Sequence, residues 1–199
     1  MSVPIILASG STIRAQLLKN AGVPFTVQMA RVDEDTMKRA LLAEDAAPRD
    51  IADALAEIKA RKISDKSPGA MVLGCDQVLD FGGQLLSKPK TPEDALKQLK
   101  GMRGKRHMLL SAAVIYQDGE PIWRHVGQVR LWMRMSSDAY LRDYVDRNWD
   151  SIRHAVGAYK LEEEGVRLFA TIDGDYYNVL GMPLLELLNY LAVKGVIDQ

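Results

Sequence analysis

Asp76 is the residue whose type and surroundings most clearly indicate chemistry. It lies inside the nearly continuous apolar run of residues 71–79, which predicts a strand covered on both faces. An ionised carboxylate there costs on the order of several kcal/mol unless it is paired, protonated or bound to a metal. Strand alternation places Gly74 on the same face, where we expect it to leave open space beside the carboxylate. Asp76 is therefore either a structural group bonded to the backbone or to a core arginine, or a general base or metal ligand in a cleft, and the sequence slightly favours the second.

The stretch of residues 5–14 indicates an anion-binding turn. An apolar run breaks into Ser and Gly and then into a helical pattern, so we expect a strand, a tight loop and a helix capped by Ser11. Such a junction directs free backbone N–H groups and the positive end of the helix at one point, which suits a phosphate. Arg14, in the first helical turn, is unfavourable for the helix dipole unless an anion lies nearby. A plain capped helix start is the simpler alternative.

Other charged side chains are weaker candidates when taken singly. Lys59 lies at the edge of an apolar helical stripe, where its ammonium could reach a cleft or merely extend to water. Lys88 precedes Pro89, which holds it extended, although a solvated loop lysine is the simpler alternative. Glu34 belongs to an acidic run that could hold Mg²⁺ or only solvate a loop. Glu162 is the first of three consecutive glutamates, and their simplest interpretation is a solvent-exposed start of a helix.

Several catalytic classes lack their motifs. The sequence contains no Gly-x4-Gly-Lys-Ser/Thr loop, no Gly-x-Gly-x-x-Gly after a strand and no Gly-x-Ser-x-Gly elbow. The histidines His107, His125 and His154 lack zinc-like spacing, and Cys75 is buried by pattern without an activating partner. Carboxylates, Arg and Lys around an anion loop suit metal-assisted attack of water on a phosphoanhydride.

Composition limits the partners. The 26 basic and 26 acidic residues balance, which argues against a polybasic surface for a nucleic acid polymer. The single Cys75 suits a reducing compartment, and no cationic segment precedes the apolar run of residues 3–8 as in a signal peptide. No stretch approaches the roughly 18 apolar residues of a membrane span. We expect a soluble, cytoplasmic protein.

The elements alternate between helical and strand patterns. We expect strands at residues 24–29, 71–79, 108–116, 121–133 and 166–172, and helices at about 35–44 and 49–65 and from Ser137 to about residue 148. Further helices are expected to begin after Ser11, at Pro92, and at Met182-Pro183, where the apolar pattern is Leu184, Leu185, Leu188 and Leu191. Asp118-Gly119 predicts a hairpin, and Thr91 and Ser137 predict helix caps. Mingled helices, isolated strands and hairpins indicate an α/β fold with a mixed sheet containing antiparallel parts, in a single domain over residues 1–199.

Six segments in order resemble the Maf nucleotide pyrophosphatases over essentially the full chain. They are residues 7–14, 32–34, 56–60, 74–78, 87–89 and 172–184. The resemblance implies a twisted mixed sheet with helices and two lobes flanking a cleft, a chain that often forms homodimers, and hydrolysis of nucleoside triphosphates to monophosphate and pyrophosphate with Mg²⁺ or Mn²⁺.

The matched positions imply roles. Ser11 and Arg14 would hold the phosphates and Lys59 and Lys88 would offset their charge, while Asp76 would activate water. Glu34, together with Asp76, would bind the metal. The family segment Glu-Pro-x-x-Lys-Ala-Gly is replaced here by residues 151–158, so a lysine is lost, and Arg153 or His154 is the candidate substitute.

Three positions bear on the base. Ile13, Gln77 and Glu162 match the family branch resembling 7-methyl-GTP pyrophosphatases, whereas the dTTP and UTP branch typically has Arg, Thr and Gln there. Glu162 can accept from guanine N1–H and the 2-amino group, and its charge favours a cationic methylated ring; Ile13 can pack against that ring. The alternatives are a dTTP/UTP pyrophosphatase of the same family and a non-enzymatic, nucleotide-sensing regulator of septum formation. Retention of every charged site position favours an enzyme.

Overall fold

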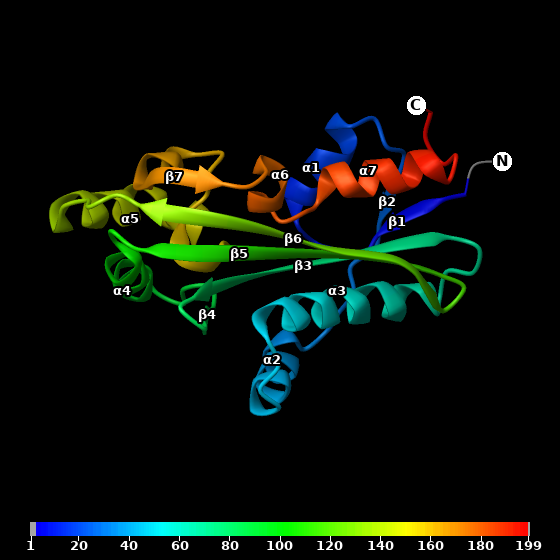
Figure 1. The fold of residues 1–199 in the computed structure, drawn as a ribbon, viewed down its shortest axis with the longest axis horizontal. Helices are drawn as coiled ribbons and strands as arrows, with labels where there is room; N and C mark the ends of the chain where they lie inside the picture. Colours follow the sequence, from blue (N-terminus) through cyan, green and yellow to red (C-terminus); the bar gives the residue numbers. More distant parts are fainter. Residues whose placement is uncertain (1–2, 199) are drawn as a thin grey trace. The chain divides into compact units, whose positions relative to one another are not determined.

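A seven-stranded mixed sheet with helices forms the framework of the computed structural model, which describes residues 3–198 (Figure 1). The strands are β1 (Ile5–Leu7), β2 (Thr26–Val27), β3 (Met71–Phe81), β4 (Gln84–Leu86), β5 (Arg106–Gln117), β6 (Glu120–Met133) and β7 (Phe169–Asp173). The α-helices are α1 (Thr12–Asn20), α2 (Glu34–Ala43), α3 (Pro48–Ser64), α4 (Pro92–Met102), α5 (Asp138–Ile152), α6 (Tyr176–Val179) and α7 (Leu184–Val193). Two short 3-10 helices are η1 (Val156–Ala158) and η2 (Glu164–Leu168).

The strand order confirms the predicted mixed sheet. The order is β2-β1-β3-β5-β6-β7, with β4 paired to β3. The β1 strand runs parallel to both β2 and β3, whereas the β3–β4 and β6–β7 pairs are antiparallel. The β5–β6 turn is Asp118-Gly119, and both residues have positive φ (51° and 83°), as a two-residue hairpin turn requires.

Most predicted elements are confirmed, several of them with boundaries shifted by one or two residues, and three elements differ more. Strand β2 keeps only two residues of the predicted run, and α5 extends beyond residue 148 to Ile152. The predicted strand at residues 166–172 was wrong in its first part, because residues 166–168 belong to η2 and β7 begins at Phe169. Gly165 explains this turn, since a Cβ built there would lie 2.4 Å from the carbonyl oxygen of Lys160. The backbone folds tightly upon itself before the strand begins.

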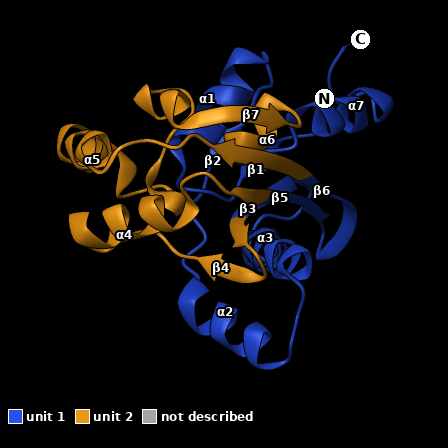
Figure 2. Cartoon of the chain, turned by 60° about the vertical axis from the view of Figure 1, so that its left-hand side comes forward, with its two compact units in different colours: residues 1–77, 110–127, 181–199 blue, residues 78–109, 128–180 orange. Residues whose placement is uncertain are grey.

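The chain divides into two compact units, coloured separately in Figure 2. Unit 1 comprises residues 1–77, 110–127 and 181–199, and unit 2 comprises residues 78–109 and 128–180. The long strands β3, β5 and β6 each contribute residues to both units. The two-lobed part of the prediction therefore corresponds to two units that are each assembled from separate stretches of sequence.

Within unit 1, α3 covers one face of the sheet, and α1 and α7 cover the other (Figure 1). Helix α3 presents Ala52, Ala56 and Ala60 at every fourth position, and all three are 0% exposed. Alanines at this spacing form a smooth face that lets a helix lie close to a strand. Close approach of α3 to β3 is what positions the charged groups described below.

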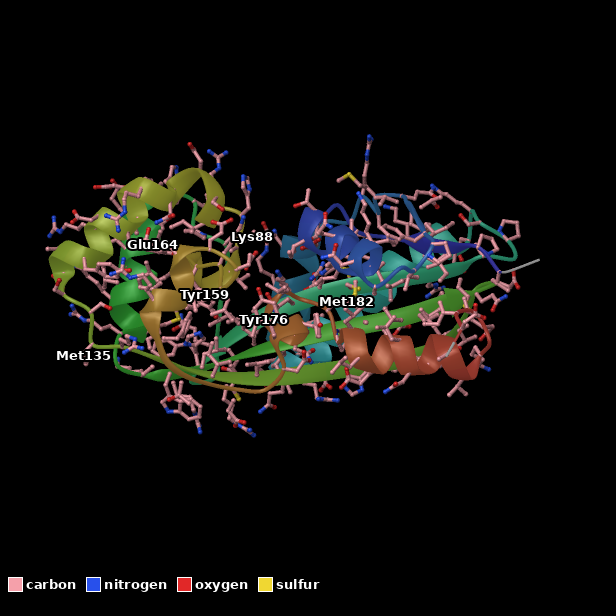
Figure 3. The ribbon with its side chains drawn as sticks, turned by 90° about the horizontal axis from the view of Figure 1, so that it is seen from above. Lys88, Met135, Tyr159, Glu164, Tyr176 and Met182 are labelled. Atoms are coloured by element: carbon pink, nitrogen blue, oxygen red, sulfur yellow. The ribbon has the colours of Figure 1, made fainter. Side chains whose placement is uncertain are left out.

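Unit 2 has its own apolar core around α4, α5 and the strand segments of that unit. Tyr159, labelled in Figure 3, packs edge-on against Phe169 with ring centroids 4.8 Å apart. Its hydroxyl lies 2.9 Å from Nε2 of His107. Burial lowers the pKa of His107 to about 4, so this histidine is a neutral core residue.

Candidate functional site

The opening turn has the predicted strand, loop and capped helix, but the N–H groups of Ser11 and Arg14 are not free. Ser11 has extended backbone angles and caps α1, and its hydroxyl accepts from the N–H of Arg14 at 3.5 Å. The Ser9 hydroxyl accepts from the N–H of Ser11 at 3.2 Å. Two serines thus fix the turn between β1 and α1, while Gly10 at its tip is exposed.

Arg14 connects three parts of unit 1. Its Nε donates to the carbonyl of Gly181 at 2.8 Å, and its Nη1 donates to the carbonyl of Cys75 at 3.0 Å. Nη1 also lies 3.3 Å from the Ser9 hydroxyl. A cation in the first turn of a helix is unfavourable unless acceptor groups lie nearby, and these three oxygens are such acceptors. The position of Arg14 therefore does not by itself require a bound anion. Phosphate binding by Arg14 stays a prediction.

A buried lysine links two of the predicted carboxylates. Lys59 Nζ lies 2.6 Å from Asp76 Oδ1 and 2.7 Å from Glu34 Oε1. Lys59 is 7% exposed and Asp76 is 4% exposed, whereas the Glu34 side chain, at the start of α2, keeps 38% of its surface exposed. We call these three residues the Lys59 cluster. The sequence predicts each of them separately as a candidate site residue, and the fold brings the three side chains together.

Asp76 has one carboxylate oxygen to spare. Oδ1 is bound to Lys59, but Oδ2 is buried and has no hydrogen-bond partner. A buried carboxylate oxygen without a donor is costly, so Oδ2 is poised to accept a proton, a donor or a cation. Neighbouring Cys75 is inert by contrast, because burial raises the pKa of its thiol to about 11.

The expected open space at Gly74 is not there. A Cβ built at Gly74 would lie 2.1 Å from the carbonyl oxygen of Ala56 and 2.9 Å from the Cβ of Ala60. The alternation rule placed Gly74 and Asp76 correctly on one face, but α3 fills the space above that face. Gly74 therefore allows α3 to come close enough for Lys59 to reach Asp76.

The remaining candidates are spread along the chain. In unit 1, Gln77 is half-buried and donates to the Ser111 hydroxyl at 2.9 Å, and Ile13 is half-buried on α1. In unit 2, Lys88 is exposed between β4 and α4 (Figure 3), and Glu162 is exposed before η2. The pair Arg153 and His154 lies exposed where α5 ends.

Sequence reasoning missed the structural role of the glutamates that follow Glu162. Glu164 accepts from Arg147 Nη2 at 2.7 Å and from Asn148 Nδ2 at 2.8 Å, and these bonds lower its pKa to about 2. Glu163 accepts from the Ser151 hydroxyl at 2.7 Å. The run of residues 162–164 is therefore not a solvated helix start. Its last two glutamates form an anchor, which means here that they hydrogen-bond residues of α5 and hold the segment against that helix. Only Glu162 is left outside this anchor.

The donor set suits a hard divalent cation only in part. Within residues 3–198, no three His, Cys, Asp or Glu side chains are grouped so as to hold a metal ion. Mg²⁺ commonly takes only one or two carboxylates and completes its shell with water and substrate phosphates. Asp76 Oδ2 and the half-exposed Glu34 carboxylate fit that pattern. None of the helices within residues 3–198 has the length and apolar character needed to cross a bilayer.

Comparison with known proteins places the chain in a family. The model of the Maf-like proteins matches residues 4–193, so the chain belongs to the Maf family. It is 77% identical over 198 residues to a protein of Ruegeria pomeroyi named nucleoside triphosphate pyrophosphatase, with 100% of both chains covered. A protein of Caulobacter vibrioides with the same name is 49% identical, covering 98% of this chain and 97% of the relative. A Brucella abortus protein named 7-methyl-GTP pyrophosphatase is 43% identical, with 100% of both chains covered.

Proposed function

We propose that this protein hydrolyses nucleoside triphosphates to a nucleoside monophosphate and pyrophosphate. Relatives named for this activity align along the whole chain. The observation that carries the chemistry is the Lys59 cluster, in which a buried carboxylate keeps one oxygen unpartnered beside an ammonium. A proton acceptor held next to a cation is what attack of water on a polyanion needs.

Asp76 acts as the base when water attacks the α-phosphorus. Asp76 Oδ2 takes a proton from water while the water oxygen forms a bond to the α-phosphorus. The bond from that phosphorus to the oxygen bridging to the β-phosphorus breaks, and pyrophosphate leaves with the electron pair. Lys59 holds Asp76 in orientation through Oδ1.

Other residues bind rather than react. The positive end of α1 at Ser11 suits a phosphate, and Arg14 positions the opening turn while adding positive charge. Lys88 is proposed to offset charge on the phosphates. Glu34 and Asp76 would hold Mg²⁺ or Mn²⁺, which when bound offsets phosphate charge and lowers the pKa of water.

We propose a 7-methylated guanine nucleotide as the preferred substrate, with dTTP or UTP as the alternative. The proposal rests on Glu162 as acceptor for the guanine edge and on Gln77 and Ile13 beside the base. Burial and the nearby Glu162 carboxylate both raise the pKa of Tyr176, so Glu162 has an aromatic neighbour in unit 2. Removing one matched polar contact in a base pocket can change discrimination by up to about 10⁴-fold. A cytoplasmic homodimer is also expected.

The test is hydrolysis of a panel of 7-methyl-GTP, GTP, dTTP and UTP with Mg²⁺ or Mn²⁺, scored by pyrophosphate release. We expect Asp76→Asn to lower kcat by at least about 10²-fold on every substrate. Glu162→Gln should instead lower kcat/KM selectively for 7-methyl-GTP. Normal turnover in Asp76→Asn would refute the general base, and a preference of the wild type for dTTP and UTP would refute the base assignment.

A further inference from the structure

A basic hollow lies in unit 1 outside the residues assigned above. It has a volume of about 390 Å³ and is lined by Gln28, Met29, Arg31, Lys62, Ile63 and Lys66. Three of these side chains are cationic, one carries an amide, two are apolar, and none is acidic. Cations and an amide donor around a concave surface are suited to a ligand with several anionic oxygens.

One wall of the hollow, formed by Gln28, Met29 and Arg31, contacts the turn between β1 and α1. The N–H of Gln28 donates to the carbonyl of Leu7, the last residue of β1, at 3.1 Å. The terminal methyl of Met29 lies against Gly10, because a Cβ built at Gly10 would be 2.7 Å from it. Gln28 and Met29 therefore lie beside the turn that is proposed to hold phosphate.

The other wall continues from the Lys59 cluster. Lys62 follows Lys59 by three residues on α3, which puts the two on neighbouring turns about 4.5 Å apart along the helix axis. Lys66 lies just beyond the end of the helix, and the Lys62 ammonium donates to the carbonyl of Arg31, which joins the two walls. One helix thus presents Lys59 to the buried carboxylate and Lys62 to the hollow.

The two acidic residues that follow Arg31 most closely along the chain are engaged elsewhere. Asp33 accepts from the N–H and the hydroxyl of Thr36 at the start of α2, and these bonds lower its pKa. Glu34 is bound to Lys59. The positive charge of Arg31, Lys62 and Lys66 is therefore not offset by a carboxylate in the lining of the hollow.

We propose that this hollow is a polyphosphate subsite that takes the two terminal phosphates of the substrate and then the pyrophosphate that leaves. The inference rests on the proposed function for its role in turnover, but binding of pyrophosphate at the hollow can be tested without turnover. The shared chemistry is a diphosphate group, presented either by the nucleotide or as the free ion.

The first experiment is calorimetric titration of inorganic pyrophosphate into the full-length protein at low salt. Arg31→Gln/Lys66→Gln removes two cations and spares Lys62, whose ammonium bonds the wall. Charge-assisted contacts of this kind predict at least about a tenfold loss of pyrophosphate affinity. The control is Lys19→Gln/Lys97→Gln, which removes the same charge at two exposed positions outside the hollow. The control should change the affinity by less than about threefold.

The second experiment separates the two sources of the diphosphate. If the nucleotide's terminal phosphates occupy the hollow, Arg31→Gln/Lys66→Gln raises KM for the triphosphate and leaves inhibition by the nucleoside monophosphate unchanged. If only the free ion binds, KM is unchanged and pyrophosphate inhibition alone weakens. Equal pyrophosphate affinity in wild type and Arg31→Gln/Lys66→Gln overturns the subsite, even in an active enzyme. Loss of pyrophosphate binding in a protein that hydrolyses no triphosphate supports the subsite and refutes the proposed function instead.

Discussion

Replacing Lys59 by methionine tests whether the Lys59 cluster is a buried, paired charge. The change keeps an unbranched side chain of similar length but leaves the Asp76 carboxylate, 4% exposed, without its cation. Removing one partner of a buried ion pair costs about 3–5 kcal/mol. The Glu34 carboxylate contributes little to this figure, because 38% of its side chain is exposed to water.

The design is a double-mutant cycle with a matched surface control. Lys59→Met should lower the free energy of unfolding by about 3–5 kcal/mol. Adding Asp76→Asn should recover at least about 2 kcal/mol, because the uncompensated charge disappears. Glu34→Gln should cost less than about 1 kcal/mol.

The assay is urea denaturation, followed by circular dichroism and by tryptophan fluorescence to check that both transitions coincide. With a slope of about 3 kcal/mol per molar urea, Lys59→Met shifts the midpoint by about 1 M or more. A loss below about 1 kcal/mol in Lys59→Met would refute the reasoning, and so would a further loss on adding Asp76→Asn.

Two further predictions concern packing and acid stability. Gly74→Ala should destabilise by about 3 kcal/mol in the same urea assay, because its Cβ would meet the Ala56 carbonyl 2.1 Å away; Gly101→Ala, in α4 with nothing within 4 Å of its Cβ, should be neutral or stabilise by up to about 1 kcal/mol. A neutral Gly74→Ala would contradict the close approach of α3. The lowered pKa of Glu164, about 2 against an ordinary 4.5, means that its bonds stabilise the fold above pH 4.5 and lose that effect as the pH falls toward 2. The difference in Tm between wild type and Arg147→Gln should therefore shrink below pH 4.5, and a difference that is constant from pH 7 to pH 3 would contradict this assignment.

Local chemistry in the sequence predicted much of the fold. The caps at Ser11, Thr91 and Ser137 each accept the expected backbone N–H, and the Asp118-Gly119 turn forms. Caps and tight turns depend on residues within three or four positions of one another, so they can be predicted without knowledge of the tertiary structure. The single-domain assignment over residues 1–199 stays a prediction.

What the sequence could not supply is distance between elements. The face shared by Gly74 and Asp76 followed from alternation, but the presence of α3 above it did not. The bond between Lys59 and Asp76 joins residues 17 positions apart, and the bonds of Arg14 reach residues 61 and 167 positions away. The argument from the helix dipole considered only α1, which carries Arg14. It therefore predicted an anion beside the guanidinium, where the carbonyl groups of Cys75 and Gly181 already accept its hydrogen bonds.

The division into two units also determines the order in which the chain can fold during synthesis. The polypeptide passes between the units at residues 77/78, 109/110, 127/128 and 180/181. Unit 2 is fully synthesised once residue 180 has been made, whereas unit 1 must wait for α7, whose Leu184, Leu187 and Leu191 are at most 4% exposed. A chain that stalls before α7 would leave exposed the apolar surface that these leucines cover. The turn around Ser11 precedes all of unit 2 along the chain, yet it belongs to the unit that is completed later.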